Sequence, residues 1–178
     1  MTDRAAIDQR ASRIKLLLMD CDGVLTDGRL MLLENGDEQK LFNVRDGQGL
    51  VLLRRMGVQT GIISGRRSSF VDLRARELAI NYLRQGSGDK VKDFDELLAE
   101  SGLEASAVAF VGDDLGDIPL LRRAGLAVAV ADAVAEVRAV AHYVTQLPGG
   151  HGAVREAIEL ILKAQDRWDE AVKHFLTQ

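Results

Sequence analysis

Short apolar segments alternate with amphipathic segments of about ten residues along most of this sequence, and that alternation limits the fold more than any other feature. Apolar runs at 14–19, 58–63, 107–112 and 126–131 have the length and composition of buried strands. Strands that alternate with helices predict βαβ units and a parallel sheet. The predicted class is therefore α/β, with the sheet sandwiched between helices on both faces.

Two further short strands are predicted at 80–85 and 142–146. The predicted helices cover 46–56, 66–79, 90–102, 117–125, 133–141 and 152–176, the last as one long amphipathic helix. In the first of these helices, Asp46 is the predicted N-cap and Gly57 the predicted stop.

A β-hairpin is predicted between the first strand and the first helix. The stretches at 29–34 and 39–44 flank the dipeptide Asn35-Gly36, which is typical of hairpin turns. We expect a small flap at about 29–42.

Composition excludes several classes of protein. With 178 residues and no repeat or linker, the chain is predicted to be one domain over 1–178, ending in a helix and tail at about 152–178. A single cysteine rules out a disulfide within the chain and, without a signal-peptide pattern, favours the cytoplasm. No apolar run reaches the roughly 18 residues of a membrane span. A net charge of −4 and 4% aromatic residues argue against nucleic-acid binding.

Charged and polar residues stand where the predicted strands end. Asp20 and Asp22 follow the first strand, Ser64 follows the second, and Asp113 follows the strand that ends at Gly112, while Lys90 begins a helix after a glycine-rich turn. Ligand sites in open parallel sheets lie beyond the carboxyl ends of the strands. These residues are therefore predicted to form one site.

Carboxylates at Asp20, Asp22, Asp113 and Asp117 would repel one another at one sheet edge, so the pattern predicts a bound cation. Mg²⁺, a hard cation with oxygen ligands, fits such a site. Asp20 can then attack a phosphoryl group and form an aspartyl-phosphate. Asp22 can protonate the leaving alkoxide and later deprotonate the attacking water.

Ser64 and Lys90 complete this predicted site by holding phosphate oxygens. Each residue also has a plainer interpretation. An Asp-x-Asp pair is common in solvated turns, Ser64 suits a turn or a helix cap, and Lys90 alone would be an ordinary surface lysine. Their combination favours a magnesium-dependent phosphatase.

Together these clusters resemble the four motifs of the haloacid dehalogenase superfamily. They occur in order as Asp20–Asp27 (DCDGVLTD), Ser64, Lys90 and Gly112–Asp117 (GDDLGD). The resemblance implies a Rossmann-like core, with Asp20 as nucleophile and Asp22 as acid/base. It also implies Mg²⁺ held by Asp20, by Asp113 and by the backbone carbonyl of Asp22. Supporting roles are implied for Asp114 and Asp117, without a distinction between them.

Many members of that superfamily carry a cap domain, and this sequence has no room for one. Residues 23–63 are taken by the hairpin, one helix and one strand, and residues 65–89 by one helix and one strand. A site without a cap is open to water, so either the substrate is large or neighbouring subunits cover the site. We favour an oligomer.

A narrower resemblance covers nearly all of residues 14–175. Segments such as FNVRDGQGL, YLRQGSGDK and YVTQLPGGHGAVRE resemble the 3-deoxy-D-manno-octulosonate 8-phosphate (KDO 8-P) phosphatases. This implies hydrolysis of that acidic sugar phosphate to KDO and inorganic phosphate, in lipopolysaccharide precursor synthesis. The residues implied to line the substrate site are Asp22, Asn43, Val44, Arg45, Asp46, Gly47, Arg66, Arg74 and Lys90. Arginines suit such a substrate because they bind carboxylates through paired donors, although Arg74 also suits a solvated helix face.

The same resemblance implies a homotetramer whose flaps cover neighbouring active sites. The glycines of 149–152 would permit a flexible tail that reaches a neighbour's site, although an ordinary loop explains them equally. Two rivals stay open: a phosphatase of a nonulosonate 9-phosphate, and a non-catalytic regulatory domain of the same fold. The complete set of Asp20, Asp22, Lys90 and Asp113 speaks against the second.

Overall fold

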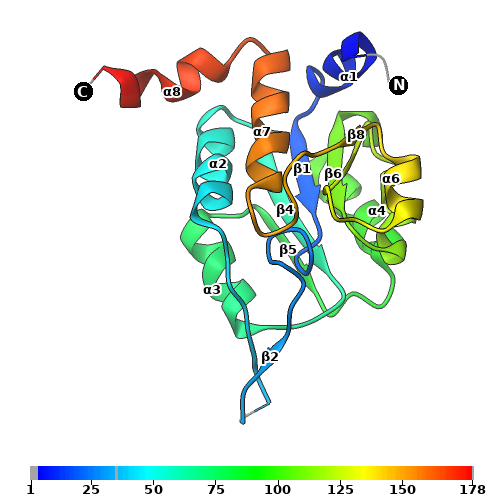
Figure 1. Cartoon of the computed structure of the whole chain (residues 1–178). Helices are drawn as coiled ribbons and strands as arrows, with labels where there is room; N and C mark the ends of the chain where they lie inside the picture. Colours follow the sequence, from blue (N-terminus) through cyan, green and yellow to red (C-terminus); the bar gives the residue numbers. More distant parts are fainter. Residues whose placement is uncertain (1–3, 35, 178) are drawn as a thin grey trace.

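The computed structural model describes residues 4–34 and 36–177, and its centre is a six-stranded sheet (Figure 1). The strands are β1 (Leu16–Met19), β4 (Gln59–Ser64), β5 (Tyr82–Gln85), β6 (Val108–Gly112), β7 (Leu126–Ala129) and β8 (Tyr143–Val144). Their order is β5-β4-β1-β6-β7-β8, and every neighbouring pair is parallel. The predicted α/β fold with a parallel sheet is confirmed.

Helices cover both faces of the sheet. One layer holds α1 (Arg4–Ala11), α2 (Val44–Arg55), α3 (Ser69–Leu78) and α7 (Ala153–Ala164), and the other holds α4 (Lys90–Ser101), α5 (Ile118–Leu121) and α6 (Ala135–Val140). The chain moves outward from β1 to β5, returns through α4 to β6 and then moves outward on the other side. The strand order therefore reverses between β1 and β6, where doubly wound sheets bind ligands at their carboxyl edge.

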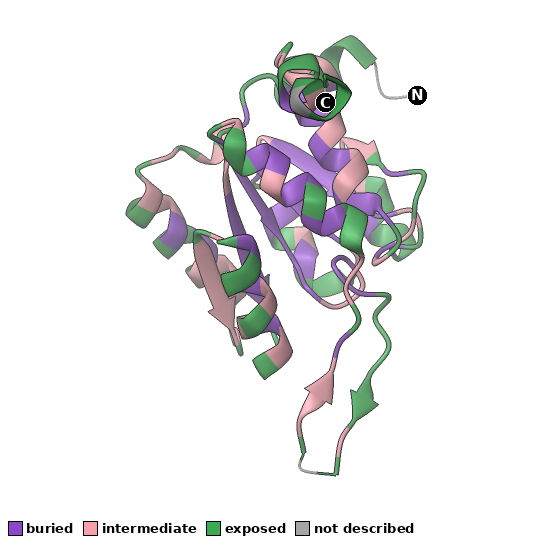
Figure 2. Cartoon of the chain, turned by 90° about the vertical axis from the view of Figure 1, so that its left-hand side faces the viewer, coloured by how far each residue is buried: buried purple, intermediate pink, exposed green. Residues whose placement is uncertain are grey.

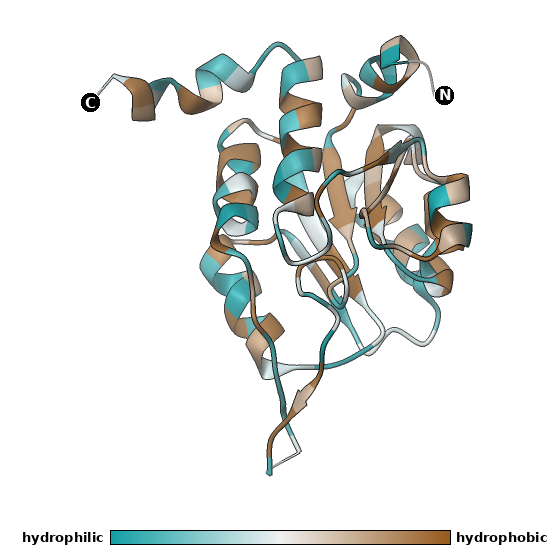
Figure 3. Ribbon diagram, in the orientation of Figure 1, coloured by the Kyte–Doolittle hydropathy of each residue, from teal (hydrophilic) through white to brown (hydrophobic). Residues whose placement is uncertain are grey.

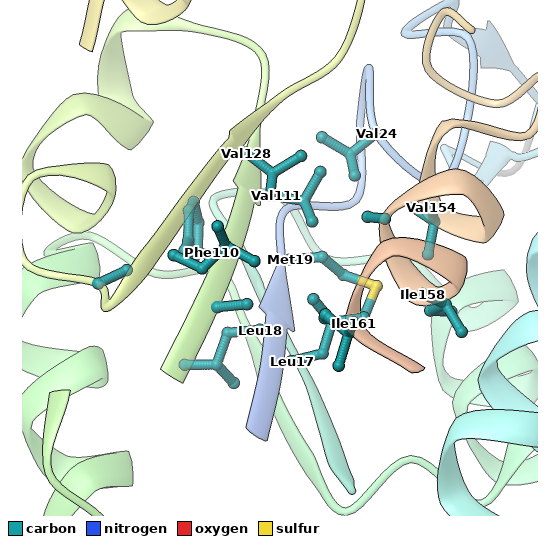
Figure 4. Packing of buried hydrophobic residues seen from close by; sticks show 14 of the residues in the cluster. Leu17, Leu18, Met19, Val24, Phe110, Val111, Val128, Val154, Ile158 and Ile161 are labelled. Atoms are coloured by element: carbon teal, nitrogen blue, oxygen red, sulfur yellow. The ribbon is translucent and has the colours of Figure 1, made fainter. Parts of the chain in front are cut away.

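The core fills the space between the sheet and these helices. Leu17 and Met19 of β1 pack toward Ile158 and Ile161 of α7, whereas Leu18 lies on the opposite face beside Phe110 (Figure 4). Successive residues of a strand point to opposite faces, so a strand buried on both sides must be apolar throughout. This is why β1 reads LLLM, and each such burial stabilises the fold by about 1.5–3 kcal/mol.

Local capping fixes the helix ends. The predicted N-cap of α2, Asp46, is wrong: the helix begins one turn earlier, and the side chain of Asn43 accepts a hydrogen bond from Arg45 N at 2.8 Å. Asp46 is instead buried against another helix, as described below. The predicted stop of α2 is correct, since Gly57 follows the helix with φ of +73°, and Gly102 likewise follows α4 with φ of +67°.

The predicted single helix at 152–176 is wrong, because the chain forms α7 and then a separate α8 (Trp168–Leu176). Asp166 lies between them with φ +55°, and Arg167 N donates to Leu162 O at 2.9 Å, which closes the first helix. Gln165 ties this break to the start of β1 by donating to Ile14 O at 2.8 Å. Sequence reasoning also missed α1, and the helix predicted at 117–125 shortens to α5 preceded by a 3-10 turn, η2 (Leu115–Asp117).

The predicted hairpin is present and forms a flap that projects from the body (Figure 2). Strands β2 (Met31–Leu32) and β3 (Glu38–Gln39) pair antiparallel, with Met31 opposite Gln39. Asn35, the first residue of the predicted turn, lies outside the described residues. Among those described, only this flap and α2 separate β1 from β4, so no cap domain stands there.

Within the described ranges, every helix is too short or too polar to cross a membrane.

Candidate active site

The parallel register brings the predicted catalytic residues to one edge of the sheet. Met19 of β1 is level with Ile62 of β4 on one side and Val111 of β6 on the other. Asp20, Ser64 and Asp113 therefore leave neighbouring strands at nearly the same height. Consecutive members of this set are more than 40 residues apart in the sequence, and strand pairing brings them close together in space.

Three carboxylates meet at this edge. Asp20, Asp113 and Asp117 each offer one oxygen, and these oxygens lie within 4.8 Å of one another. Oδ1 of Asp113 is buried and accepts no hydrogen bond from any described residue. A buried carboxylate oxygen without a partner is costly unless a cation satisfies it, so this donor set fits a hard divalent cation.

Lys90 links two of these carboxylates. Its Nζ lies 3.0 Å from Asp20 Oδ2 and 2.8 Å from Asp117 Oδ1. Lys90 is the first residue of α4, whose N-terminus is capped by Asp89 through bonds from Val91 N and Lys92 N. The cap fixes the direction in which the helix leaves the sheet, and thereby the position of the ammonium group.

The structure separates the two aspartates that the sequence left equivalent. Asp117 is buried, and its Oδ2 accepts from Asp113 N at 3.0 Å, so it shapes the loop that carries Asp113. Asp114 is exposed, and its Oδ1 accepts from Leu115 N at 2.8 Å as the cap of η2. Asp117 thus belongs to the carboxylate cluster, whereas Asp114 points away into solvent.

Burial and crowding make Asp113 and Asp20 weak acids in the absence of a cation. Burial and the neighbouring Asp117 raise the pKa of Asp113 to about 8. Burial followed by Asp117 also raises the pKa of Asp20 to about 6, against the opposing effect of Lys90. Because the ionised carboxylates destabilise one another here, a bound cation would stabilise their ionised forms.

This crowding predicts how a cation changes stability with pH. Because the folded-state pKa of Asp113 lies above its unfolded value of 3.8, metal-free protein loses stability as pH rises toward 8. A bound cation removes that penalty, so Mg²⁺ is expected to raise Tm more at about pH 9 than at about pH 6. Thermal unfolding with Mg²⁺ and with chelator at both pH values measures this, and an equal rise at both would contradict it.

Asp22 lies next to the cluster but its side chain does not join it. Its Oδ1 pairs with the ammonium group of Lys40, which also lies 3.3 Å from Glu38 Oε2. Gly23, directly after it, has φ +84°, and a Cβ there would collide with the carboxylate of Asp113. Glycine at this position therefore lets the first loop approach the β6 loop closely enough to share one ligand site.

Two hydroxyls stand at the ends of β4 and β5. Ser64 is buried, and its Oγ accepts from Arg66 N at 3.3 Å. Ser87 N donates to Ser64 O at 3.0 Å, and the buried Ser87 Oγ has no partner among the described residues. Sequence reasoning missed Ser87, although it lies in the same GSGDK stretch that pointed to Lys90.

Asp46, predicted to line the substrate site, has a second role in the structure. Its carboxylate accepts from Arg155 N at 2.7 Å and from Gly152 N at 3.2 Å, which caps the N-terminus of α7. Burial raises its pKa despite these two hydrogen bonds. The substrate role remains a prediction, and the capping role rests on the contacts.

We expect Asp46→Ala to lower the free energy of unfolding by about 1–2 kcal/mol, because two backbone donors of α7 lose their acceptor. Chemical denaturation measures the loss, and KM for a phosphate ester should change little. A large rise in KM at unchanged stability would instead support direct contact with substrate.

The predicted arginines do not gather in one place within the chain. Arg66 lies beside the flap, where its Nη1 donates to Glu38 Oε1 at 2.8 Å. Arg74 lies over the ring of Phe42 at 5.8 Å and bonds Glu77 at 2.8 Å.

Arg45 lines a cavity together with Gly152 and Arg155, and the clustered carboxylates do not line that cavity. Of the remaining predicted residues, Gly47 packs beside Arg74, and Val44 is 79% exposed. The side-chain Nδ2 of Asn43, the N-cap of α2, donates a hydrogen bond to Gly150 O at 3.2 Å.

The glycines of 149–152 serve a packing role that the sequence did not reveal. A Cβ at Gly149 would collide with the backbone of Gly23, and Gly150 N donates to Val24 O at 2.9 Å. The stretch is thus an ordered loop against the loop that carries Asp22. Glycine is needed there because two backbones approach closely.

Comparison with known proteins places this chain in a family. The haloacid dehalogenase-like hydrolases match residues 80–158. The 3-deoxy-D-manno-octulosonate 8-phosphate phosphatase KdsC of Yersinia pestis is 47% identical over 163 residues, which cover 92% of this chain and 87% of that protein.

Solved structures agree with this assignment. The Moraxella catarrhalis 3-deoxy-D-manno-octulosonate 8-phosphate phosphatase, in complex with magnesium, phosphate and KDO, aligns with a TM-score of 0.92 and 44% identity, covering 95% of this chain and 97% of that one. The cobalt-bound Haemophilus influenzae phosphatase of the same substrate aligns with a TM-score of 0.89 and 37% identity, covering 95% and 100%. The chain therefore belongs to the KDO 8-P phosphatase family of the haloacid dehalogenase-like hydrolases.

Proposed function

We propose that this chain is a magnesium-dependent phosphatase that hydrolyses KDO 8-P to KDO and inorganic phosphate. The observation that carries the proposal is the meeting of three carboxylates, Asp20, Asp113 and Asp117, at one sheet edge. Lys90 pairs with two of them, Asp20 and Asp117, and the buried Oδ1 of Asp113 has no partner among the described residues. The similarity to relatives that are phosphatases of this substrate supplies the substrate class.

Asp20 is the proposed nucleophile. One of its oxygens attacks phosphorus as the bond from phosphorus to the sugar oxygen breaks, which leaves an aspartyl-phosphate. Asp22 gives its proton to the departing sugar oxygen and then takes a proton from the water that hydrolyses the aspartyl-phosphate. Lys90 and the hydroxyl of Ser64 bind phosphate oxygens, since both groups stand at the same edge.

The residues proposed to hold Mg²⁺ are Asp20 and Asp113 through their side chains and Asp22 through its backbone carbonyl. A bound Mg²⁺ offsets the repulsion between an anionic nucleophile and an anionic phosphate. Asp117 keeps Asp113 in place through the bond to its backbone N–H, and it holds Lys90 from the other side.

A panel of sugar phosphates, assayed with Mg²⁺ and then with chelator, tests the proposal. We expect KDO 8-P to have the highest kcat/KM, with activity lost on chelation and restored by Mg²⁺. Preference for a nonulosonate 9-phosphate would assign the rival substrate. No hydrolysis of any phosphate ester would support the regulatory alternative.

We also propose that the chain works as a homotetramer whose flaps cover neighbouring sites. The ribbon of the flap contains hydrophobic stretches (Figure 3). The exposed apolar residues of the flap, α2 and α3 are Leu30, Met31, Leu32, Leu41, Val44 and Leu73. Lone exposed apolar residues are ordinary, but Leu41, Val44 and Leu73 line one cavity of about 520 Å³, and such a grouping fits an interface. In this assembly Arg45 and Arg74 would serve a neighbour's site.

Sedimentation velocity tests the assembly. Leu32, 71% exposed on the flap, is the position to change. We expect Leu32→Glu to dissociate the tetramer and raise KM, while Leu32→Met keeps both. A monomeric wild-type protein with full activity would reject the assembly.

We place the reaction in lipopolysaccharide precursor synthesis in the cytoplasm, because that is where the proposed substrate would be used.

A further inference from the structure

Lys40 is a buried lysine that the mechanism above does not use. Its side chain is only 1% exposed, and it lies directly after strand β3 in the stem of the flap. Lysine is rarely buried, because its charge loses hydration unless nearby acids compensate. A lysine in this position therefore depends on the specific partners that surround it.

Those partners form a chain of alternating charge. The ammonium group pairs with Asp22 Oδ1 on one side and lies 3.3 Å from Glu38 Oε2 on the other, and Glu38 Oε1 accepts from Arg66 at 2.8 Å. Ser68 Oγ donates to the backbone oxygen of Glu38 at 3.0 Å, which anchors β3 to the start of α3. Lys40 is thus held in a fixed place, and Asp22 is held by Lys40.

The contact uses only one oxygen of Asp22. Lys40 takes Oδ1, while Oδ2 receives no hydrogen bond from any residue in the described ranges. A carboxyl group that moves protons needs one free oxygen aimed at the reacting atom, and it gains when the other oxygen fixes its rotamer. The arrangement at Asp22 meets both conditions.

We propose that Lys40 is a positioning residue that holds Asp22 through Oδ1, so that Oδ2 exchanges the proton with the leaving sugar oxygen and then with water. The inference rests on the proposed function, because it assigns Asp22 as the acid and base. In the first step Oδ2–H supplies the proton as the bond from sugar oxygen to phosphorus breaks and the Asp20 oxygen–phosphorus bond forms. In the second step Oδ2 takes a proton from water as that bond is cleaved.

A change of leaving group distinguishes positioning from a merely structural role. A sugar alkoxide needs a proton in order to leave, whereas p-nitrophenolate leaves without one. We expect Lys40→Met to slow single-turnover release of KDO from KDO 8-P by about 100-fold or more, and single-turnover release of p-nitrophenolate from p-nitrophenyl phosphate by less than about tenfold. Equal slowing of both, or slowing of neither, would overturn the proposal.

Two comparisons keep this test decisive. Lys163→Met removes another ion-paired lysine, bonded to Glu159 at 2.7 Å on α7, and is expected to leave both rates unchanged. Because Lys40→Met leaves Asp22 facing Glu38, the double variant Lys40→Met/Glu38→Gln removes that repulsion if the single variant unfolds. It is expected to show the same selective loss. If wild-type protein fails to hydrolyse KDO 8-P, the proposed function fails, whereas a wild-type rate with unselective loss defeats only the role of Lys40.

Discussion

Replacing Asp20 with asparagine is expected to lower kcat for phosphate release by at least about 10⁴-fold. The amide has almost the same shape as the carboxylate, but it cannot form the covalent link to phosphorus. Every later step depends on that link, so neighbouring groups cannot restore the rate. Steady-state phosphate release with saturating Mg²⁺ measures the loss, and mass spectrometry of quenched wild-type enzyme should detect an added phosphoryl group that the variant lacks.

The same variant should keep its fold. Burial and Asp117 raise the pKa of Asp20, so its ionised form is disfavoured inside the protein, and a neutral amide relieves part of that cost. Without Mg²⁺, we therefore expect the Tm of Asp20→Asn to equal or exceed that of the wild type. Turnover close to the wild-type rate would rule out Asp20 as the nucleophile, whereas a collapsed Tm would make the kinetic result uninformative about chemistry.

Replacing Asp113 with asparagine is expected to raise the Mg²⁺ concentration for half-maximal activity by at least about 100-fold. Loss of a group that only orients a metal ligand costs about 10- to 100-fold in metal affinity, so loss of the charged ligand should cost no less. The buried Oδ1 of Asp113, which no described residue satisfies, is the structural reason. Mg²⁺ titrations of activity, together with calorimetric Mg²⁺ binding, measure the effect.

Asp114→Asn is the matched control, since it makes the same chemical change at the next residue. Asp114 is exposed and caps η2, and asparagine caps a helix as well as aspartate does. We expect less than about a threefold change in kcat or in the Mg²⁺ requirement. Equal loss in the two variants would show that the exposed carboxylate also acts on the cation, against the division of roles drawn above.

Much of the fold could be predicted because local patterns carry it. The apolar run of β1 can be satisfied only between two layers, and Gly57 and Gly102 end their helices through a left-handed conformation that favours glycine. The break between α7 and α8 could not be predicted in this way. The amphipathic pattern continues across it, and the turn at Asp166 is fixed by the bond from Gln165 to the start of β1, distant in sequence.

Some residues of the candidate site could likewise be predicted from local sequence patterns, and others could not. Asp20, Asp22, Ser64, Lys90 and Asp113 were predicted because strand ends in a parallel sheet share one edge. The sequence pattern did not predict roles for Lys40 and Ser87. A lysine in a flap and a serine in a glycine-rich turn are usually surface residues, and only the tertiary structure buries the Lys40 side chain and the Ser87 hydroxyl. Asp46 read as a cap for its own helix, yet it caps α7 from more than 100 residues away.

By itself, the sequence determined the α/β class, the absence of room for a cap, and the residue types of a phosphate site. These follow from periodicity, spacing and chemistry, which are local properties. Only the tertiary structure decided which aspartate joins the cluster, which oxygen of Asp22 has no partner among the described residues, and which arginines stand apart from the cluster. Those outcomes depend on distances between segments far apart in the chain, and packing sets such distances.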